Sequence, residues 1–146
     1  MLSLATMLED SSHNHPDRVA LVQGDRHLTY REVDEQARRL AHHLTQRGIG
    51  PGDRVAVACP NLVDFPVTYY SILKAGAVVV PMNVLMKAAK IRSYLTDYSA
   101  KTLICCAGTS ELDLCVQGRA AFDAVNTCEH FILIGEARAG SRRLNH

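Results

Sequence analysis

The stretch Leu73-Lys-Ala-Gly-Ala-Val-Val-Val-Pro-Met-Asn83 decides the fold class of this sequence. Gly76 is a suitable residue to end a helix, and residues 77–80 after it are apolar at every position up to Pro81. An apolar run without polar alternation is typical of a strand buried on both faces, as in a parallel sheet covered by helices. We therefore expect a buried parallel strand at 77–80.

Outward from this stretch, short apolar segments alternate with segments of helical periodicity. The predicted strands are 54–59, 77–80, 101–106 and 131–134. The predicted helices between them run from Asp64 to Gly76, from about Met86 to Asp97, and from about Ser110 to Ala124. This alternation implies βαβ units joined by right-handed crossovers. The predicted fold class is α/β, with a mostly parallel sheet, helices on both of its faces and a small N-terminal β-hairpin.

Helical spacing also predicts which side chains face inward. In the helix that Asp64 is expected to cap, Pro66 falls at the second position, where no backbone hydrogen bond is lost. The inward residues predicted for this helix and the next are Phe65, Tyr69, Ile72 and Leu73, followed by Ile91, Leu95 and Tyr98.

The first thirty residues predict a short helix and the β-hairpin. Apolar residues recur at helical spacing within residues 3–12, and Pro16 follows that segment. Residues 19–28 then form two short runs around Gly24-Asp25, an acceptable two-residue hairpin turn.

The helix that follows the hairpin has the clearest signals in the sequence. Thr29 and Glu32 have the spacing of a capping box, and Leu28 with Val33 forms a hydrophobic staple across it. Gly48 is suited to end the helix in a left-handed conformation. On the solvent face, Asp34 with Arg38 and Glu35 with Arg39 are expected to pair four residues apart.

Length, composition and charge limit the function classes. The chain has 146 residues and a net charge of +1, so we expect one compact domain at 1–136 and a flexible tail at 137–146. Near-neutral charge argues against nucleic acid or an anionic membrane as partner. No apolar run approaches the roughly 20 residues that cross a bilayer, and residues 1–10 lack the pattern of a signal peptide. We therefore expect a cytoplasmic protein. An excess of Arg over Lys hints at a bacterial source.

The residue types that carry out catalysis do not form a recognisable constellation. The glycines at 48, 50 and 52 lie between a helix and a strand, the reverse of a dinucleotide-binding loop, and predict a plain turn. The cysteines are odd in number and include no C-x-x-C pair, so we interpret them as small buried hydrophobic residues; they are Cys59, Cys105, Cys106, Cys115 and Cys128. The histidine pairs 13/15 and 42/43 lack partners at metal-ligand spacing and are interpreted as solvated.

Three stretches together resemble the start of the adenylate-forming superfamily, which includes acyl-CoA synthetases, luciferases and the adenylation domains of peptide synthetases. Leu28-Thr-Tyr-Arg-Glu-Val-Asp34 is similar to the family's L-T-Y-x-E-L motif. Gly48-Ile-Gly-Pro-Gly-Asp-Arg-Val55 is similar to G-V-x-P-G-D-R-V, and the stretch 73–83 to L-K-A-G-A-x-x-V-P-L-N. The resemblance covers about residues 15–106, and its motifs are mainly architectural.

The resemblance implies a function for a longer parent protein. Family enzymes activate a carboxylic acid with ATP and magnesium and pass the acyl group to a thiol, usually coenzyme A. The family's Ser/Thr/Gly-rich phosphate loop and its catalytic lysines have no match in these 146 residues. We therefore expect an N-terminal fragment of an AMP-forming acid–CoA ligase that is inactive alone, holds no catalytic, cofactor-binding or metal-binding residue, and has the remainder of the parent enzyme as its partner.

Asn83 is the one residue with a candidate role in substrate binding. Amino-acid-activating relatives tend to have Asp at this position, so Asn83 favours the branch of fatty-acid–CoA ligases. It is expected either to line one wall of the acyl cleft or simply to cap the start of the next helix. Lys90 and Met86-Lys87 depart from the family pattern and weaken the assignment of a subfamily.

Two other functions stay open from the sequence. The chain is alternatively a non-catalytic relative that binds a partner or forms a homo-oligomer through faces that the rest of an enzyme would cover. A free-standing flavodoxin-like nucleotide binder is disfavoured, because no loop from a strand to a helix is rich in glycine.

Overall fold

The computed structural model describes residues 4–60, 62–107 and 114–135. In chain order its elements are α1 (Leu4–Asn14), β1 (Val19–Gln23), β2 (Arg26–Thr29), α2 (Tyr30–Gln46), β3 (Arg54–Ala58), α3 (Asp64–Lys74), β4 (Val78–Met82), α4 (Ala88–Asp97), β5 (Thr102–Cys106), α5 (Leu114–Asp123) and β6 (His130–Ile134). The chain forms two compact units. The N-terminal unit contains α1, β1, β2, α2 and α3, and the sheet unit contains β3 to β6 with α4 and α5.

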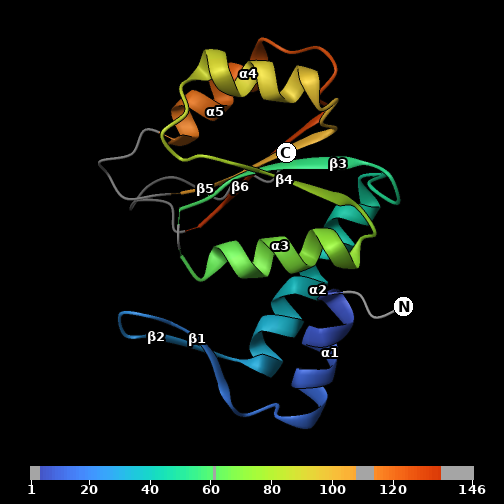
Figure 1. The fold of residues 1–146 in the computed structure, drawn as a ribbon, viewed down its shortest axis with the longest axis vertical. Helices are drawn as coiled ribbons and strands as arrows, with labels where there is room; N and C mark the ends of the chain where they lie inside the picture. The colour runs from blue at the N-terminus through green and yellow to red at the C-terminus, as the bar shows by residue number, and fades with distance from the viewer. Residues whose placement is uncertain (1–3, 61, 108–113, 136–146) are drawn as a thin grey trace. The chain divides into compact units, whose positions relative to one another are not determined.

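The sheet unit is built on four strands in the order β4-β3-β5-β6, and every neighbouring pair is parallel. Helices α4 and α5 lie together over one face of this sheet (Figure 1). The α/β class, with a parallel sheet flanked by helices and a separate antiparallel hairpin, is therefore confirmed.

The core of the sheet unit lies between the sheet and this helix pair. Ala56, Leu103 and Phe131 stand in register on neighbouring strands and belong to one buried cluster. Ile91 and Leu95 of α4 enter the same cluster, as predicted from their spacing. Tyr98 was expected inward and is exposed, because α4 ends at Asp97 and Tyr98 forms its C-cap.

Strand β4 differs from the expectation. It lies at an edge of the described sheet, Val78 is exposed, and the strand continues through Pro81 to Met82. Proline is tolerated at an edge because its missing N–H group then costs no ladder hydrogen bond. The strand predicted at 101–106, by contrast, is buried along all of β5.

The N-terminal unit packs its three helices and the hairpin around a second cluster. This cluster consists of Leu8, Leu28, Val33, Ala37, Val63 and Val67. The hairpin turns at Gly24-Asp25 as predicted, with Gly24 at φ +56°.

Both ends of α2 have the predicted caps. The backbone N–H of Glu32 donates to Oγ1 of Thr29 at 3.2 Å, and the N–H of Thr29 donates to Oε1 of Glu32 at 3.0 Å. Gly48 adopts φ +83°, and the N–H groups of Gly48 and Ile49 donate to the carbonyls of Thr45 and Leu44. This paired arrangement is a Schellman motif, which satisfies the last carbonyl groups of the helix.

Helix α3 begins one residue earlier than predicted. Asp64 is its first residue, and Val63 occupies the N-cap position without a side-chain hydrogen bond. Asp64 lies instead 3.7 Å from the Arg26 guanidinium. Pro66 consequently falls at the third position, still within the first turn, where its missing N–H group is not needed.

The buried side of α3 was only partly predicted. Ile72 is buried as expected, whereas Phe65, Tyr69 and Leu73 are half-buried. The other buried residues are Val67, Thr68 and Ser71, two of them polar and therefore missed by a search for apolar periodicity. The predicted helix at 110–124 appears as α5 at Leu114–Asp123; residues 110–113 and the predicted tail at 137–146 lie outside the described residues.

Candidate functional site

Asn83 directly follows β4, at the carboxyl end of a parallel sheet, and its side chain is exposed. Its Oδ1 accepts a hydrogen bond from the N–H of Leu85 at 2.8 Å, and its carbonyl accepts one from the N–H of Met86 at 3.2 Å. Helix α4 begins only at Ala88, with Lys87 as N-cap. Asn83 therefore closes a turn, and the expectation that it caps the helix was wrong.

The other strands of the sheet end close to this edge with small or neutral residues. Cys59 follows β3, Ala107 follows β5 and Gly135 follows β6. Ligands of open α/β sheets bind outside the carboxyl ends of the strands, where the following loops carry the reactive groups. Among the residues described here, those that directly follow the strands provide an amide and a thiol but no charged side chain.

Two charged contacts of the sheet unit lie at the amino ends of the strands. Nζ of Lys101 lies 3.6 Å from Oδ2 of Asp53, and the guanidinium of Arg54 donates to the Tyr98 carbonyl at 3.0 Å. These contacts tie together the segments that precede β3 and β5. Their position opposite the carboxyl edge indicates a structural role.

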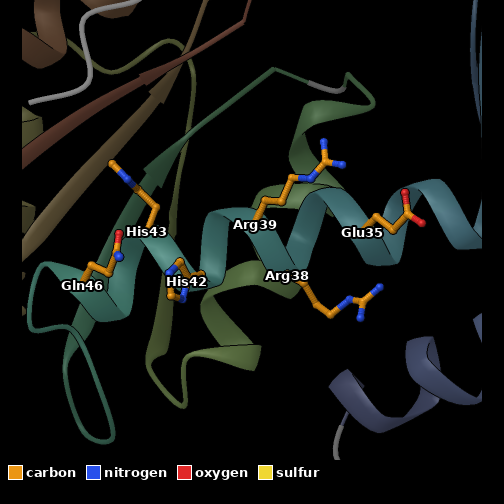
Figure 2. Close-up of a pocket in the computed structure, with 6 residues that line it drawn as sticks. All are labelled: Glu35, Arg38, Arg39, His42, His43 and Gln46. Carbon is orange, nitrogen blue, oxygen red and sulfur yellow. The ribbon is translucent and has the colours of Figure 1, made fainter.

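The exposed face of α2 carries a shallow depression (Figure 2). It is lined by Glu35, Arg38, Arg39, His42, His43 and Gln46. All six belong to one helix, and the Arg38 side chain points away from that of Arg39. Glu35 and Arg39 were also predicted to pair, but among the described residues no ion pair joins these two, whereas Asp34 and Arg38 do pair. Because the groups diverge, this surface offers no converging pair for acid–base chemistry.

His43 lies in the last turn of α2 and lines this depression. Burial lowers the pKa of His43, and the nearby charges of Arg47 and His42 lower it further. Nε2 of His43 accepts a hydrogen bond from Nε of Arg47 at 3.0 Å. A neutral imidazole with an arginine as donor is a satisfied pair. His13, His15 and His42 are exposed, as predicted, whereas His43 is half-buried and not fully solvated.

A charged network inside the N-terminal unit was missed from the sequence. Nζ of Lys74 lies 2.9 Å from Oδ1 of Asp34 and donates a hydrogen bond to Oε1 of Glu9 at 3.0 Å. Asp34 also pairs with Arg38, 3.3 Å away, as predicted. Asp34 is buried, however, and does not lie on the solvent face. Asp34 lies three residues before Ala37 and so shares the buried side of α2. This spacing was the signal in the sequence that could have predicted the burial of Asp34.

The thiols behave as the buried hydrophobic residues expected. Four are buried, Cys115 is half-buried, and none forms a disulfide with another described cysteine. Burial raises the pKa of Cys128 to about 11, and raises that of Cys105 even further, with the neighbouring Cys115 adding to the shift. Such thiols are protonated at neutral pH and are poor nucleophiles.

Residues 4–60, 62–107 and 114–135 contain neither a candidate metal cluster nor a candidate membrane-spanning helix. Within these ranges no three His, Cys, Asp or Glu side chains gather closely enough to hold a metal ion. No helix in these ranges is both long and apolar enough to span a bilayer.

The sequence of this chain is similar to those of known proteins. Residues 8–141 match the family model of the AMP-binding enzymes. A medium/long-chain-fatty-acid–CoA/3-oxocholest-4-en-26-oate–CoA ligase of Mycobacterium marinum is 40% identical over 98 residues, which are 67% of this chain and 18% of that ligase. Phosphinothricin tripeptide synthetase PhsC of Streptomyces viridochromogenes is 42% identical over 102 residues, 70% of this chain and 9% of the synthetase.

A solved structure agrees with these matches. The benzoate CoA ligase of Burkholderia xenovorans superposes with a TM-score of 0.82 at 25% identity, over 92% of this chain and 26% of the ligase. The chain thus spans about a fifth or less of the two sequence relatives. Because the family model matches nearly the whole sequence, the chain belongs to the family of AMP-binding enzymes.

Proposed function

We propose that this chain is the N-terminal part of an AMP-forming ligase that joins a carboxylic acid, specifically a fatty acid, to coenzyme A. The observation that carries the proposal is the match of residues 8–141 to the AMP-binding family, together with 40% identity to a fatty-acid–CoA ligase. Asn83 supports this branch over amino acid activation. A cytoplasmic location and a bacterial source remain predictions.

We further propose that the chain has no ligase activity alone. Adenylate formation requires fixed charges around the triphosphate and the developing oxyanion. The described residues that follow β3, β4, β5 and β6 carry no charged side chain, which supports a location of the ATP, magnesium and coenzyme A sites in the rest of the parent. The role of the chain is then to build one part of the large domain.

In this proposal Asn83 contributes to one wall of the acyl cleft. Its exposure and its place at the carboxyl end of β4 support the assignment, because this is the edge where open sheets bind ligands. The turn that it closes with Leu85 fixes the backbone there. A substitution at Asn83 is expected to change the preferred chain length of the acid more than it changes stability.

A chimera tests the proposed function. The region of the M. marinum ligase that matches this chain over 98 residues is replaced by the corresponding residues of this chain. We expect release of pyrophosphate that depends on both ATP and a fatty acid. The control chimera carries the matching region of the Mycobacterium tuberculosis ligase, which is 38% identical to this chain. A folded but inactive chimera beside an active control would contradict the proposal.

The alternative function, a non-catalytic binding or dimerisation module, makes a different prediction. The mass of the protein isolated from its source should then be close to 16.0 kDa. A ligase gives a mass several times larger, since the matched M. marinum protein is more than five times as long as the matched region.

A further inference from the structure

We propose that the exposed face of α2 docks an acidic helix of a second protein. The α2 basic face, as we call it, is the surface of the shallow depression on α2 together with the C-cap of this helix. Its charged and titratable residues are Glu35, Arg38, Arg39, His42, His43 and Arg47. All of them belong to the N-terminal unit. The inference goes beyond the proposed function, because it does not depend on the reaction that the parent carries out.

Positive charge is concentrated on this stretch of the chain. Residues 36–47 include three arginines and two histidines but no aspartate or glutamate, although the whole chain has 16 lysines and arginines against 15 aspartates and glutamates. The helix macrodipole favours cations only in the last turn. Arg38 and Arg39 lie in the middle of α2, more than one turn from either end. The stability of the helix therefore does not account for these two arginines.

Arg39 has a guanidinium group that no described residue neutralises. Within the described residues no carboxylate pairs with it, not even that of Glu35 one turn earlier. The Arg38 side chain is 63% exposed and lies 3.3 Å from Asp34, whose other oxygen already binds Lys74 at 2.9 Å. Arginine binds carboxylates through paired N–H groups. Arg39, and with it the exposed part of Arg38, can therefore donate to the carboxylates of a partner.

The arrangement of these side chains suits an elongated partner. The depression extends over residues 35–46, about 16 Å along a single helix. Figure 2 shows Arg39 and His43 on one side of α2 and Arg38 on the other side. A helix that lies alongside α2 presents side chains three or four residues apart on one face, about 5.4 Å from turn to turn. Carboxylates at that spacing would lie along the row of Arg39, His43 and Arg47, which stand four residues apart.

Two other anionic partners fit this face less well. Proteins that bind DNA through phosphates make on the order of six to ten such contacts, whereas this face has three arginines and carries the Glu35 carboxylate at one end. A helix that lies in a membrane interface combines cations with large apolar side chains, and the residues that line the depression include none. Carboxylates of a protein are therefore the favoured partner.

Binding of an acidic peptide measures the proposed docking. The probe is a fluorescein-labelled peptide with glutamates along one side of a helix, about 15 residues long so that the helix can form. Its fluorescence anisotropy, on titration with the 146-residue chain, should show saturable binding at low salt. Binding should weaken at about 0.15 M salt, where charges are screened beyond about 8 Å. A peptide of the same composition with its glutamates spread around the helix should bind at least about five-fold more weakly. No binding, or equal binding of both peptides, would overturn the inference.

Two charge-reversed variants locate the contact. Arg39→Glu changes the α2 basic face, and Arg92→Glu makes the same change of charge at an exposed position of α4. Both side chains are exposed, so neither variant should unfold the chain, which circular dichroism checks. Arg39→Glu should raise the Kd of the peptide by about ten-fold or more, and Arg92→Glu by less than about two-fold. Arg39→Gln, which only removes the charge, should raise it by about three-fold. Equal effects at the two positions would show attraction to the net charge alone and would contradict the inference.

Further outcomes decide between occupants of this face. A ligase chimera built to include α2 of this chain should bind the peptide as the isolated chain does; if a folded chimera does not, the rest of the ligase covers the face and the inference fails. Tighter binding of a short DNA duplex, or of phosphatidylglycerol vesicles, than of the peptide would also overturn it. Binding does not depend on turnover. A chimera that is inactive but binds the peptide would refute only the proposed function, and an active chimera that does not bind it would refute only the docking surface.

Discussion

Nζ of Lys74 lies 2.9 Å from Oδ1 of Asp34, and this ion pair joins α3 to α2 inside the N-terminal unit. The side chains are 6% and 11% exposed. Both residues belong to motifs by which the sequence resembles its family, Leu28 to Asp34 and Leu73 to Asn83. The two motifs are therefore physically connected, and the connection is part of the scaffold.

Replacing Lys74 should strongly destabilise the N-terminal unit. Lys74→Met leaves the buried Asp34 carboxylate with only the partly exposed Arg38 as partner, and we expect a loss of about 2–4 kcal/mol in the free energy of unfolding. Glu9→Gln is the matched control, because Glu9 is 57% exposed and its pair should contribute less than about 1 kcal/mol. Urea unfolding measures both. Equal losses for the two variants would argue against a buried pair.

The capping box should make the stability of α2 sensitive to acid. The hydrogen bonds from Thr29 lower the pKa of the Glu32 carboxyl below its ordinary value. A carboxyl group with a lowered pKa stabilises the fold above its unfolded pKa and loses this contribution as the pH falls through the folded value. Stability should thus decline below about pH 4.5.

Thr29→Ala tests the same box at neutral pH, where we expect a loss of about 1 kcal/mol. Glu32→Gln keeps an acceptor for the N–H of Thr29 but cannot titrate, so it should remove the acid dependence that Glu32 causes. The measurement is thermal unfolding at a series of pH values from neutral to acidic. An unchanged acid dependence in Glu32→Gln would rule out the box as its source.

The helix caps and the hairpin turn could be predicted because each depends on residues that are close together in the sequence. The caps at Thr29 and Gly48 and the turn at Gly24 depend on residues close in sequence, and the structure confirms them. The features that were missed depend on distant partners. Asp64 binds Arg26 and does not cap α3, and Lys74 draws Asp34 inward. No periodicity in one sequence reveals such pairs.

At the candidate site, too, one feature could be predicted from the sequence and others could not. Asn83 could be singled out from its position in a motif, yet its turn with Leu85 could not be predicted, because asparagine forms turns and helix caps with similar chemistry. The edge position of β4 was missed because the predicted strand ended at Val80; Pro81 lies within β4, and a proline inside a strand favours an edge.

Glycine at position 118 should be essential for the packing of α5. In Gly118→Ala the new methyl group would stand 2.5 Å from Sγ of Cys105, so the helix must move outward. We expect a loss of about 1–3 kcal/mol. Cys105→Ala in the same chain should recover part of it. Gly50→Ala is the control, because nothing lies within 4 Å of the added atom; a comparable loss there would contradict the steric account.

The buried thiols should resist modification until the protein unfolds. Cys105 and Cys128 have raised pKa values, about 11 for Cys128, so both are protonated at pH 8. Labelling with an aromatic disulfide reagent should be slow in buffer and fast in urea. Since the unfolded thiols ionise near pH 9 and the folded ones do so later, stability should fall as the pH rises from about 9 to 11. Rapid native labelling of Cys128 would disagree with its burial.

We propose that this chain builds a scaffold, while the reactive groups of the ligase lie elsewhere in the parent. The most direct test of this proposal is pyrophosphate release by the purified 146-residue chain, supplied with ATP, magnesium and a series of carboxylic acids. We expect no release above the rate without acid, under conditions where the chimera turns over. Acid-dependent release by the chain alone would contradict it.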